Sequence, residues 1–272
     1  MKLLAVLGNP VSHSRSPEIH QAFATACGLE IDYRKIRVPK GRFDDTARKL
    51  LASGAVGFNI TVPNKNDAFR FCDQVTEMAQ KAQAVNTVQH LADGRLVGHN
   101  TDGPGLVTDI TVNLGWSLAD KRVLVVGAGG AVQGVAASLL AKGPATIDIV
   151  NRTHQRAIDI MIRENDDRLR ARHLHELGTA YDLVISGSSA GLETGSQAIE
   201  LPGEIIGTNT RSYDMIYARE LTPFLRWCRR NGAREYCDGL GMLVEQAALA
   251  FQIWFGQVVA TSKVIKQVRG TL

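Results

Sequence analysis

Short apolar runs alternate with amphipathic segments along the first hundred residues. The strands expected from these runs cover 3–8, 33–38 and 56–61, and the expected helices cover 17–27, 42–53 and most of 64–84. Two further runs, 87–91 and 96–98, flank Asp93-Gly94, a dipeptide typical of a β-hairpin turn. A helix is expected again over 103–114. This alternation of strand and helix predicts a mainly parallel sheet with helices on both faces.

The pattern repeats after a break at 115–121. The expected strands here cover 123–126, 146–150, 183–186 and 212–216, and the expected helices cover 130–141, 153–163 and 240–257. The run Val123–Val126 is apolar throughout, as in strands that are buried on both faces of a parallel sheet. A chain of 272 residues is long enough for two domains. We therefore expect an α/β protein with two domains.

Composition and charge exclude several classes of protein. Hydrophobic residues make up 44% of the chain and charged residues 21%, a mixture typical of packed domains rather than disordered chains. The net charge of +4 is spread along the chain, so no nucleic-acid partner is expected. The 4 cysteines form no Cys-x-x-Cys pair, which argues against a metal site or a disulfide framework. No membrane span or targeting segment is recognised, so we expect a cytoplasmic protein.

A glycine-rich turn follows the apolar strand at 123–126 and precedes a helix. Its residues are Gly127, Ala128, Gly129, Gly130 and Ala131. Gly127 permits a tight turn, Gly129 lets the backbone approach a pyrophosphate, and the helix N-terminus offers free N–H groups to it. Position 132 holds Val where the dinucleotide-binding pattern has a small residue. The order of strand, turn and helix nevertheless favours dinucleotide binding over a plain connecting turn.

The end of the next strand indicates which dinucleotide is bound. In NAD-binding proteins an acidic residue at this place binds the ribose hydroxyls. Here the strand 146–150 ends in Asn151-Arg152-Thr153 instead, and Arg156 follows in the first turn of the helix. A guanidinium can pair with a 2′-phosphate, which an Asp would repel. The segment therefore favours NADP(H); the alternative is that both arginines are solvated surface charges.

Small polar residues follow several strands of the first half, where open α/β sheets bind ligands. Ser14 and Ser16 stand at a helix start and can hold a carboxylate, although Ser16 is also expected to be the N-cap of that helix. Asn59 and Thr61 place polar groups on one face of an otherwise apolar strand. Lys65 begins the next helix, where the helix dipole disfavours a cation, and this position indicates function; the alternative, which is the more common case, is a solvated surface lysine.

Two polar turns complete the set of candidate ligands. Asn86 follows Val85, and Asp102 precedes a Gly103 that begins a predicted helix. Asp102 is expected to be the N-cap of that helix. Gly103 and Gly105 leave room for a ligand nearby.

These segments together resemble the shikimate dehydrogenases, the NADP-dependent enzymes of the shikimate pathway. The matching segments run in the family's order over nearly the whole chain and are Gly8–Pro10, Ser12–Pro17, Asn59–Lys65, Ala84–Thr87, Asn100–Gly103, Gly127–Ala131, Asn151–Thr153, Tyr213–Tyr217, Thr222–Leu225 and Asp238–Gln246. No single segment is specific, but their joint occurrence in this order is highly specific.

The resemblance implies a fold, a reaction and a set of residues. The fold is an N-terminal α/β substrate domain with a mainly parallel sheet (1–102, completed by 239–272) and a Rossmann-type NADP-binding domain (103–238). The implied reaction is the reversible reduction of 3-dehydroshikimate to shikimate, with Lys65 and Asp102 as the catalytic pair. The implied substrate-binding residues are Ser14, Ser16, Asn59, Thr61, Asn86, Asp102, Tyr217 and Gln246. The expected cofactor-binding residues are Gly127, Ala128, Gly129, Gly130, Ala131, Asn151, Arg152, Thr153 and Arg156, with Met215 and Gly239 against the nicotinamide.

The chain departs from the family pattern at two places. His99 stands where the family has an Asp before Asn-Thr-Asp-Gly, and 186–191 replaces a strand end of Asn-Ala-Thr type near the cofactor. The alternatives to a shikimate dehydrogenase are a quinate/shikimate dehydrogenase paralogue with relaxed cofactor or substrate use and a non-catalytic NADP-binding sensor. The expected partner is a small-molecule substrate, and the chain is expected to be a monomer or a homodimer.

Overall fold

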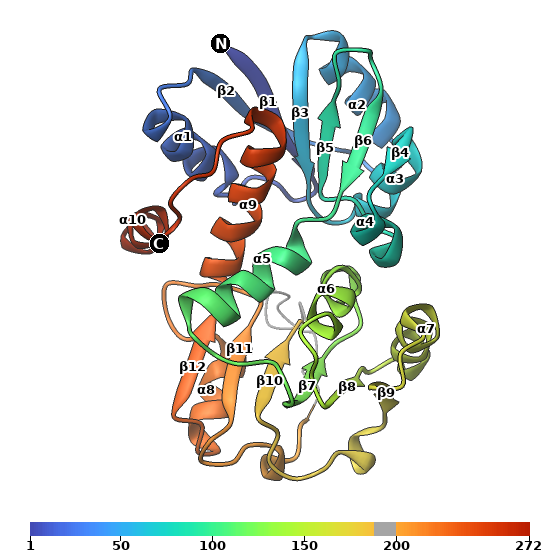
Figure 1. The fold of residues 1–272 in the computed structure, drawn as a ribbon, viewed down its shortest axis with the longest axis vertical. Coiled ribbons are helices and arrows are strands. Elements are labelled where there is room, and N and C mark those ends of the chain that lie inside the picture. The colour runs from blue at the N-terminus through green and yellow to red at the C-terminus, as the bar shows by residue number, and fades with distance from the viewer. Residues whose placement is uncertain (188–199) are drawn as a thin grey trace. The chain divides into compact units, whose positions relative to one another are not determined.

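The computed structural model describes residues 1–187 and 200–272, which fold into two compact units. Unit 1 consists of residues 1–105 and 243–271, and unit 2 consists of residues 106–242 and residue 272. The boundaries expected from the sequence, 102 and 239, lie a few residues away from these. Each unit is built on a six-stranded sheet (Figure 1).

The sheet of unit 1 has the strand order β2-β1-β3-β5-β6-β4. Its strands are β1 (Lys2–Gly8), β2 (Ile31–Arg37), β3 (Ala55–Ile60), β4 (Gln74–Val75), β5 (Thr87–His90) and β6 (Leu96–His99). Only β5 runs antiparallel to its neighbours, so the sheet is mainly parallel, as expected. The helices of this part of the chain are α1 (Ser16–Ala26), α2 (Phe43–Ala52), α3 (Lys65–Phe71), α4 (Glu77–Ala82), α5 (Asp102–Thr108), α9 (Leu240–Phe255) and α10 (Ser262–Gly270).

The segment 64–84, which was expected to be largely helical, forms two helices and not one, because the chain between α3 and α4 forms β4. Cys72 is already extended, and Asp73 accepts the backbone N–H of Leu96 through its carboxylate at 2.7 Å. Thr76 then donates its backbone N–H to the carbonyl of Gly98 at 2.9 Å. The segment that forms β4 therefore pairs with the otherwise unpaired edge of β6, although its local sequence pattern alone predicts a helix. The helix expected over 103–114 forms, but only its first part, α5, is α-helical, and it continues as a π-helical turn at Asp109–Asn113.

The C-terminal helix α9 packs on the sheet of unit 1, and Figure 1 shows it crossing that sheet. Trp254 donates its indole N–H to the carbonyl of Val88 at 2.9 Å, and Gln89 donates its side-chain amide to the carbonyl of Ile253. A Cβ on Gly57 would lie 2.2 Å from Nε1 of Trp254, so only glycine permits this approach. These contacts explain why residues 243–271 belong to the N-terminal unit.

The sheet of unit 2 is wholly parallel in the order β12-β11-β10-β7-β8-β9. Its strands are β7 (Arg122–Val126), β8 (Thr146–Val150), β9 (Leu169–Arg172), β10 (Leu183–Ser186), β11 (Arg211–Asp214) and β12 (Glu235–Asp238), and its helices are α6 (Gly130–Leu140), α7 (His154–Glu164) and α8 (Pro223–Arg230). The edge strands β9 and β12 were not expected, because neither contains an apolar run.

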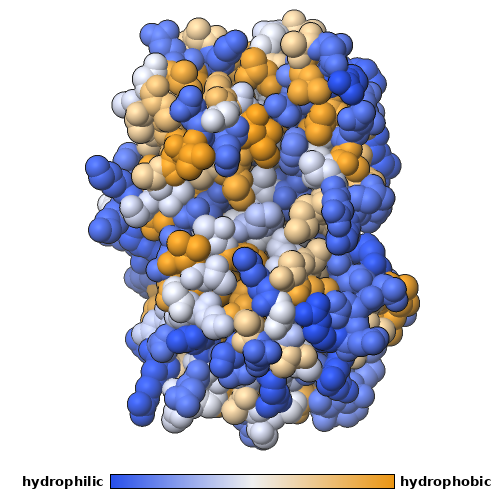
Figure 2. Space-filling view, in the orientation of Figure 1, coloured by the Kyte–Doolittle hydropathy of each residue, from blue (hydrophilic) through white to orange (hydrophobic). Residues whose placement is uncertain are grey.

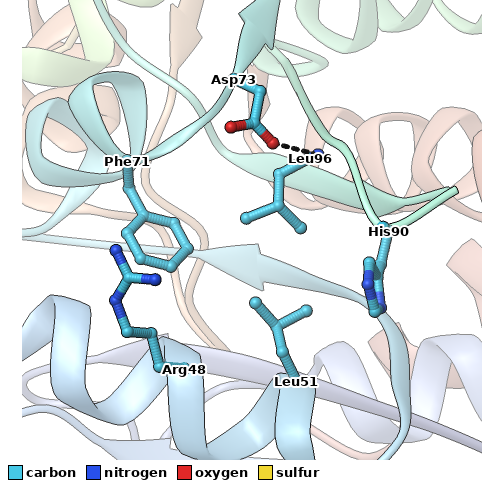
Figure 3. Close-up of a pocket in the computed structure, with 7 residues that line it drawn as sticks. Arg48, Leu51, Phe71, Asp73, His90 and Leu96 are labelled. Carbon is cyan, nitrogen blue, oxygen red and sulfur yellow. Dashed lines mark hydrogen bonds between the residues drawn. The ribbon is translucent and has the colours of Figure 1, made fainter.

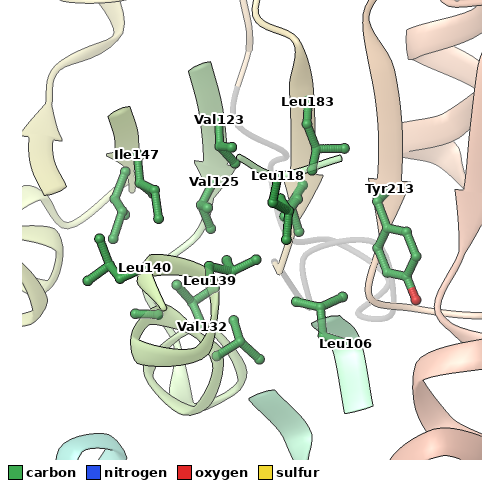
Figure 4. Close-up of a cluster of buried hydrophobic side chains, with 14 of the residues drawn as sticks. Leu106, Leu118, Val123, Val125, Val132, Leu139, Leu140, Ile147, Leu183 and Tyr213 are labelled. Carbon is green, nitrogen blue, oxygen red and sulfur yellow. The ribbon is translucent and has the colours of Figure 1, made fainter. Parts of the chain in front are cut away.

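The register of this sheet aligns the ends of its central strands. Val126 pairs with Ser186, Ser186 with Asp214, and Asp214 with Asp238. The residues that follow these strands therefore emerge at one edge, where doubly wound sheets bind nucleotides. Apolar side chains from the strands and from α6 fill the core beneath this edge (Figure 4). This packing fixes the strand ends that carry the candidate cofactor residues.

The exposed surface is mainly hydrophilic on the face drawn in Figure 2, with apolar residues in small groups. Within residues 1–187 and 200–272, no helix combines the length and the apolar character needed to cross a bilayer.

Candidate active site

The glycine-rich turn of unit 2 is held against the end of β8. Gly127 has a φ of +110°, a conformation that favours glycine, and its N–H donates to the carbonyl of Val150 at 2.8 Å. Oδ1 of Asn151 accepts the N–H of Ala128 at 3.1 Å, and the amide of Asn151 donates to the carbonyl of Thr153. The Asn151 side chain thus joins the two segments that the sequence assigned to the cofactor.

The turn leaves open space in front of the N-terminus of α6. Among the residues that the structure describes, a Cβ added to Gly129 or Gly130 would meet no atom within 4 Å, and no side chain caps the helix at Gly129. With respect to residues 1–187 and 200–272, the first N–H groups of α6 are therefore available to an anion, together with the positive end of the helix dipole. These residues fit the pyrophosphate of a dinucleotide.

Gly187 explains why Val132 is tolerated in the dinucleotide-binding pattern. A Cβ on Gly187 would lie 2.3 Å from Cγ2 of Val132, so the glycine after β10 provides the space that the valine occupies. Gly187 was not anticipated as a functional residue, although a glycine directly after an apolar strand is a usable signal. Residues 188–191, the rest of the noted departure from the family pattern, lie outside the described residues.

Arg152 and Arg156 are exposed at the start of α7, whose N-cap is Thr153. Neither guanidinium has a hydrogen bond or ion pair to another side chain in the described part of the chain. The acidic residue of this strand, Asp148, instead accepts the hydroxyl of Tyr181 at 2.7 Å and so has a packing role. Two uncompensated cations therefore lie where a 2′-phosphate would be bound.

Met215 and Gly239, the expected nicotinamide residues, are neighbours in unit 2. A Cβ on Gly239 would come 2.3 Å from the carbonyl oxygen of Met215, so the close approach requires glycine. Met215 donates its backbone N–H to the carbonyl of Ser186 at 2.8 Å. Sδ of Met215 lies 3.1 Å from the position of a Cβ on Gly187. The ends of β10, β11 and β12 therefore converge on one group of residues.

Lys65 and Asp102, which are far apart in the sequence, form an ion pair in unit 1. Nζ of Lys65 lies 2.5 Å from Oδ2 of Asp102, and the two side chains are only 17% and 11% exposed. Asn86 donates its amide to the other carboxylate oxygen, Oδ1, at 2.8 Å. The Asp102 carboxylate thus contacts Lys65 through one oxygen and the amide of Asn86 through the other. The three residues come from separate segments of the chain.

Asn86 is the centre of this polar cluster. Its Oδ1 accepts the backbone N–H of Thr101 at 2.8 Å, and its amide also donates to Oγ1 of Thr101 at 2.9 Å. Oε1 of Gln246 lies 3.5 Å from the same amide nitrogen. The backbone N–H of Asn86 donates to the carbonyl of His99 at 3.0 Å. Because that contact uses only the backbone of His99, the departure from the family's Asp leaves the cluster intact.

Two expected N-caps, Asp102 and Ser16, are wrong. In each case the side chain does not cap the helix and is available for other contacts. Asp102 is the first residue of α5, and Asn100 accepts its backbone N–H through Oδ1 at 3.1 Å. The carboxylate of Asp102 is therefore available to Lys65. Ser16 likewise lies within α1, where no side chain caps the helix, and its hydroxyl accepts that of Ser14 at 3.1 Å. The two serines present adjacent hydroxyls.

Asn59 is bound more completely within the protein than the sequence suggested. Its Oδ1 accepts the hydroxyl of Tyr33 at 2.6 Å, and its amide donates to Oγ1 of Thr87 at 3.0 Å and to the carbonyl of Asn86 at 3.2 Å. Tyr33 and Thr87 were not anticipated, because a side-chain partner on another strand leaves no local signal. Thr61 is half-buried directly after β3.

Gly105 has a different role from the expected one. A Cβ there would lie 2.7 Å from the backbone nitrogen of Gln246, so this glycine makes room for α9 rather than for a ligand. Tyr217 is half-buried in unit 2, whereas Ser14 and Ser16 belong to unit 1, and their shared contact with a carboxylate remains a prediction.

Unit 1 also has a cavity of about 260 Å³, and Figure 3 draws the residues that line it. It is lined by residues that include Arg48, Phe71 and His90, and none of the expected site residues lines it. In the ranges 1–187 and 200–272, no group of histidine, cysteine and carboxylate side chains is arranged to hold a metal ion. The acid–base pair and the polar cluster are therefore the chemically distinctive features of unit 1.

Comparisons with known proteins agree with this geometry. A family model described as the shikimate dehydrogenase substrate binding domain matches residues 6–88, one described as shikimate / quinate 5-dehydrogenase matches 109–194, and one described as the shikimate 5'-dehydrogenase C-terminal domain matches 239–269. A protein of Alkalilimnicola ehrlichii named shikimate dehydrogenase (NADP+) is 47% identical over 97% of each chain.

Two solved structures share the fold over almost the whole chain. The shikimate 5-dehydrogenase of Thermus thermophilus, in complex with NADP(H) and shikimate, has a TM-score of 0.89 and 34% identity over 100% of each chain. The Ael1 enzyme of Pseudomonas putida has a TM-score of 0.92 and 38% identity over 98% of each chain. The expected fold class is thereby confirmed, and the chain belongs to the shikimate dehydrogenase family.

Proposed function

We propose that the protein catalyses the reversible NADPH-dependent reduction of 3-dehydroshikimate to shikimate. Curated relatives that are 43% to 47% identical are named shikimate dehydrogenase (NADP+). The observation that carries the proposal within this chain is the Lys65–Asp102 pair at 2.5 Å, held by Asn86 in a largely buried polar cluster. A non-catalytic NADP-binding sensor would have no need for such a pair.

The substrate would be bound by the polar residues of unit 1 together with Tyr217. The adjacent hydroxyls of Ser14 and Ser16 suit a carboxylate, which accepts hydrogen bonds at both oxygens. The proposed ligands of the ring hydroxyls are Asn59, Thr61, Asn86, Asp102 and Gln246. The side-chain oxygen and the amide nitrogen of Asn59 already have hydrogen-bond partners within the protein. We therefore assign Asn59 chiefly to holding the neighbouring substrate-binding residues in place.

When bound, NADPH supplies the hydride that converts the ring carbonyl carbon to a carbinol carbon. The oxygen of that group must then gain a proton. A lysine ammonium is charged at neutral pH in water, so Lys65 can donate a proton from Nζ to this oxygen and recover one from solvent. In the reverse direction the neutral amine of Lys65 accepts the hydroxyl proton.

Asp102 has two tasks in this scheme. Its Oδ2 holds Nζ of Lys65 in one position, which restricts a flexible side chain to the reacting oxygen. Its carboxylate also offers acceptor capacity to the hydroxyl of the substrate. Asn86 keeps the carboxylate oriented through its bond to Oδ1. The arrangement therefore provides a positioned proton donor and the group that orients it.

The test is the absorbance of the nicotinamide on mixing the protein with shikimate and NADP+. Activity at ordinary dehydrogenase rates is expected for the wild type. Lys65→Met, which keeps the length of the side chain, should lower kcat by about 10²–10⁴-fold with little change in KM for shikimate. Lys81→Met, at an exposed ion pair on α4, is the matched control and should behave as the wild type. A Lys65→Met variant with near-normal kcat would remove the residue from the mechanism.

Quinate is the competing substrate, since the model that matches residues 109–194 covers shikimate and quinate enzymes alike. Comparing kcat/KM for the two acids, each with NADP+ and with NAD+, separates the two activities. We propose shikimate with NADP+ as the preferred combination, because the exposed guanidinium groups of Arg152 and Arg156 can pair with the 2′-phosphate on the ribose. The cytoplasmic location and the monomeric or dimeric state stay predictions.

A further inference from the structure

We infer that Tyr33 is a positioning residue for the proposed reaction, because its hydroxyl joins Ser16 to Asn59 and so holds the Ser16 hydroxyl ready for the substrate carboxylate. The inference rests on the proposed function for the identity of the substrate. It adds to that function a residue that acts through a proposed ligand and sets how tightly the carboxylate is bound.

Tyr33 reaches Asn59 across an intervening strand. Leu4 of β1 pairs with Tyr33 of β2 on one side and with Gly57 of β3 on the other. Asn59 is two residues beyond Gly57, so its side chain lies on the same face of the sheet as that of Tyr33. The hydroxyl of Tyr33 donates to Oδ1 of Asn59 at 2.6 Å. This reach over β1 requires a long side chain with a polar end, which tyrosine provides.

The ring of Tyr33 is held by aromatic contacts that do not use its hydroxyl. It is stacked on His20 of α1, with ring centroids 4.7 Å apart, and the ring of Trp254 lies 6.5 Å away. His20 is fully buried, so this side of the contact is enclosed by the protein. The aromatic neighbours therefore place the ring, and the hydroxyl is left to polar partners.

Ser16 is the second partner of the Tyr33 hydroxyl. Burial raises the pKa of Tyr33 well above its ordinary value, and a hydrogen bond with the Ser16 side chain opposes part of this rise. The Tyr33 hydroxyl therefore stays protonated at neutral pH. Ser16 is only 7% exposed, and its hydroxyl also accepts that of Ser14 at 3.1 Å. The hydroxyls of Ser14, Ser16 and Tyr33 thus follow one another in an ordered line.

The line continues from Asn59 to the acid–base pair. Asn59 donates its amide to Oγ1 of Thr87 at 3.0 Å, and Thr87 donates its hydroxyl to Oδ1 of Asn86 at 3.2 Å. Asn86 in turn donates to Oδ1 of Asp102 at 2.8 Å. Groups in a connected network hold one another in place more firmly than isolated pairs do. Tyr33 is the point at which the two serines join this network.

A fixed Ser16 hydroxyl matters because a carboxylate only accepts hydrogen bonds. A serine side chain without a partner can take any of three staggered positions about χ1, and not all of them point its hydroxyl at a given ligand. Since a hydroxyl both donates and accepts, Ser16 can turn its proton to the carboxylate while its oxygen stays beside Tyr33. Tyr33 thereby reduces the conformational freedom that Ser16 loses when the substrate binds.

This role predicts an effect on KM and not on kcat. The carboxylate of the substrate does not change during the transfer of hydride to the ring carbonyl. Its contacts are therefore equally strong in the ground state and in the transition state. A loss of such uniform binding raises KM for shikimate and leaves kcat unchanged.

The test is steady-state kinetics of Tyr33→Phe, which keeps the ring against His20 and removes only the hydroxyl. KM for shikimate should rise by about 3- to 20-fold, while kcat and KM for NADP+ should change by less than about twofold. Tyr181→Phe is the matched control, because it removes the 2.7 Å bond of another tyrosine hydroxyl, in unit 2. It should keep the wild-type KM for shikimate. Urea unfolding shows whether each variant is folded.

A double-mutant cycle with Ser16→Ala separates positioning from a general effect on folding. Ser16→Ala alone should raise KM for shikimate by about 10- to 100-fold, the range of a lost charge-assisted hydrogen bond. Because Tyr33 acts through Ser16, adding Tyr33→Phe to Ser16→Ala should raise KM by less than about a further twofold.

Three results would overturn the inference. The first is a Tyr33→Phe variant with wild-type kinetics, and the second is a loss of kcat at unchanged KM. The third is an equal rise in KM with and without Ser16, which would assign the hydroxyl to folding or to Asn59 alone. Tyr33→Met also lacks the hydroxyl and repeats the cycle should Tyr33→Phe fail to fold. Failure of the proposed function shows separately, as a wild type that binds NADP+ but does not oxidise shikimate.

Discussion

His20 provides a quantitative test of how unit 1 is packed. Its side chain is fully buried on α1, and its ring is stacked on Tyr33 at 4.7 Å between centroids and 11° between planes. The rings of Trp254, Phe23 and Phe251 lie within 6.2 Å of it. In the parts of the chain that are described, neither ring nitrogen has a hydrogen-bond partner. The protein therefore holds His20 neutral in an aromatic cage.

The burial of His20 predicts acid sensitivity of a definite size. Burial lowers the pKa of His20 to about 3 from the usual 6.5, and the Asn59 side chain offsets only part of this shift. The unfolded chain therefore binds a proton that the folded chain does not, once the pH falls below about 6.5. Stability is lost from there down to about pH 3. Between pH 7 and pH 5 the loss from this residue alone is about 2 kcal/mol.

Urea unfolding at pH 7, 6 and 5, followed by circular dichroism, measures this loss. His20→Phe keeps an aromatic ring in the cage and cannot be protonated, so its free energy of unfolding should fall by about 2 kcal/mol less than that of the wild type over this range. His175→Gln, at an exposed histidine, should follow the wild type. A wild-type pH slope in His20→Phe, and equally in the smaller His20→Leu, would refute the reasoning.

Three further predictions concern unit 2. Gly239→Ala places a Cβ 2.3 Å from the carbonyl oxygen of Met215, so we expect a loss of about 1–3 kcal/mol in chemical unfolding and weaker NADP+ binding in titration; wild-type values in both would contradict the packing. Arg152→Ala should weaken NADP+ binding by about tenfold or more and leave NAD+ binding unchanged, whereas an equal loss for both would exclude the 2′-phosphate contact. Tyr181→Phe removes the 2.7 Å bond to Asp148 and should lower the free energy of unfolding by about 1–3 kcal/mol at unchanged kcat, which urea titration and the absorbance assay check together.

The sequence was informative where a signal is local. Apolar runs located the central strands to within one or two residues, because a strand buried on both faces needs uninterrupted apolar side chains. The turn Gly127–Ala131 was recognisable because a positive φ and a close phosphate both require small residues. Lys65 was singled out because a cation at a helix start is locally unfavourable. Each of these inferences uses residues that are neighbours in the chain.

Edge strands and caps were the features that local patterns mispredicted. β4, β9 and β12 form because a neighbouring strand offers unpaired backbone groups, which is a property of the sheet and not of the segment that joins it. Asp102 is a residue type that favours the N-cap, yet it is the first residue of α5: its backbone N–H donates to Asn100, and its carboxylate binds Lys65. An N-cap preference is worth only about 1 kcal/mol, so a charged partner outweighs it.

The order of residues along the chain was enough to establish the fold class, the family and the residue types of the site. Only the folded chain shows which residues meet: Lys65 with Asp102, Asn86 with the same carboxylate, and Asn59 with Tyr33. The physical reason is that a polar contact between distant segments depends on strand order and register, and neither leaves a trace in the spacing of residues along the chain.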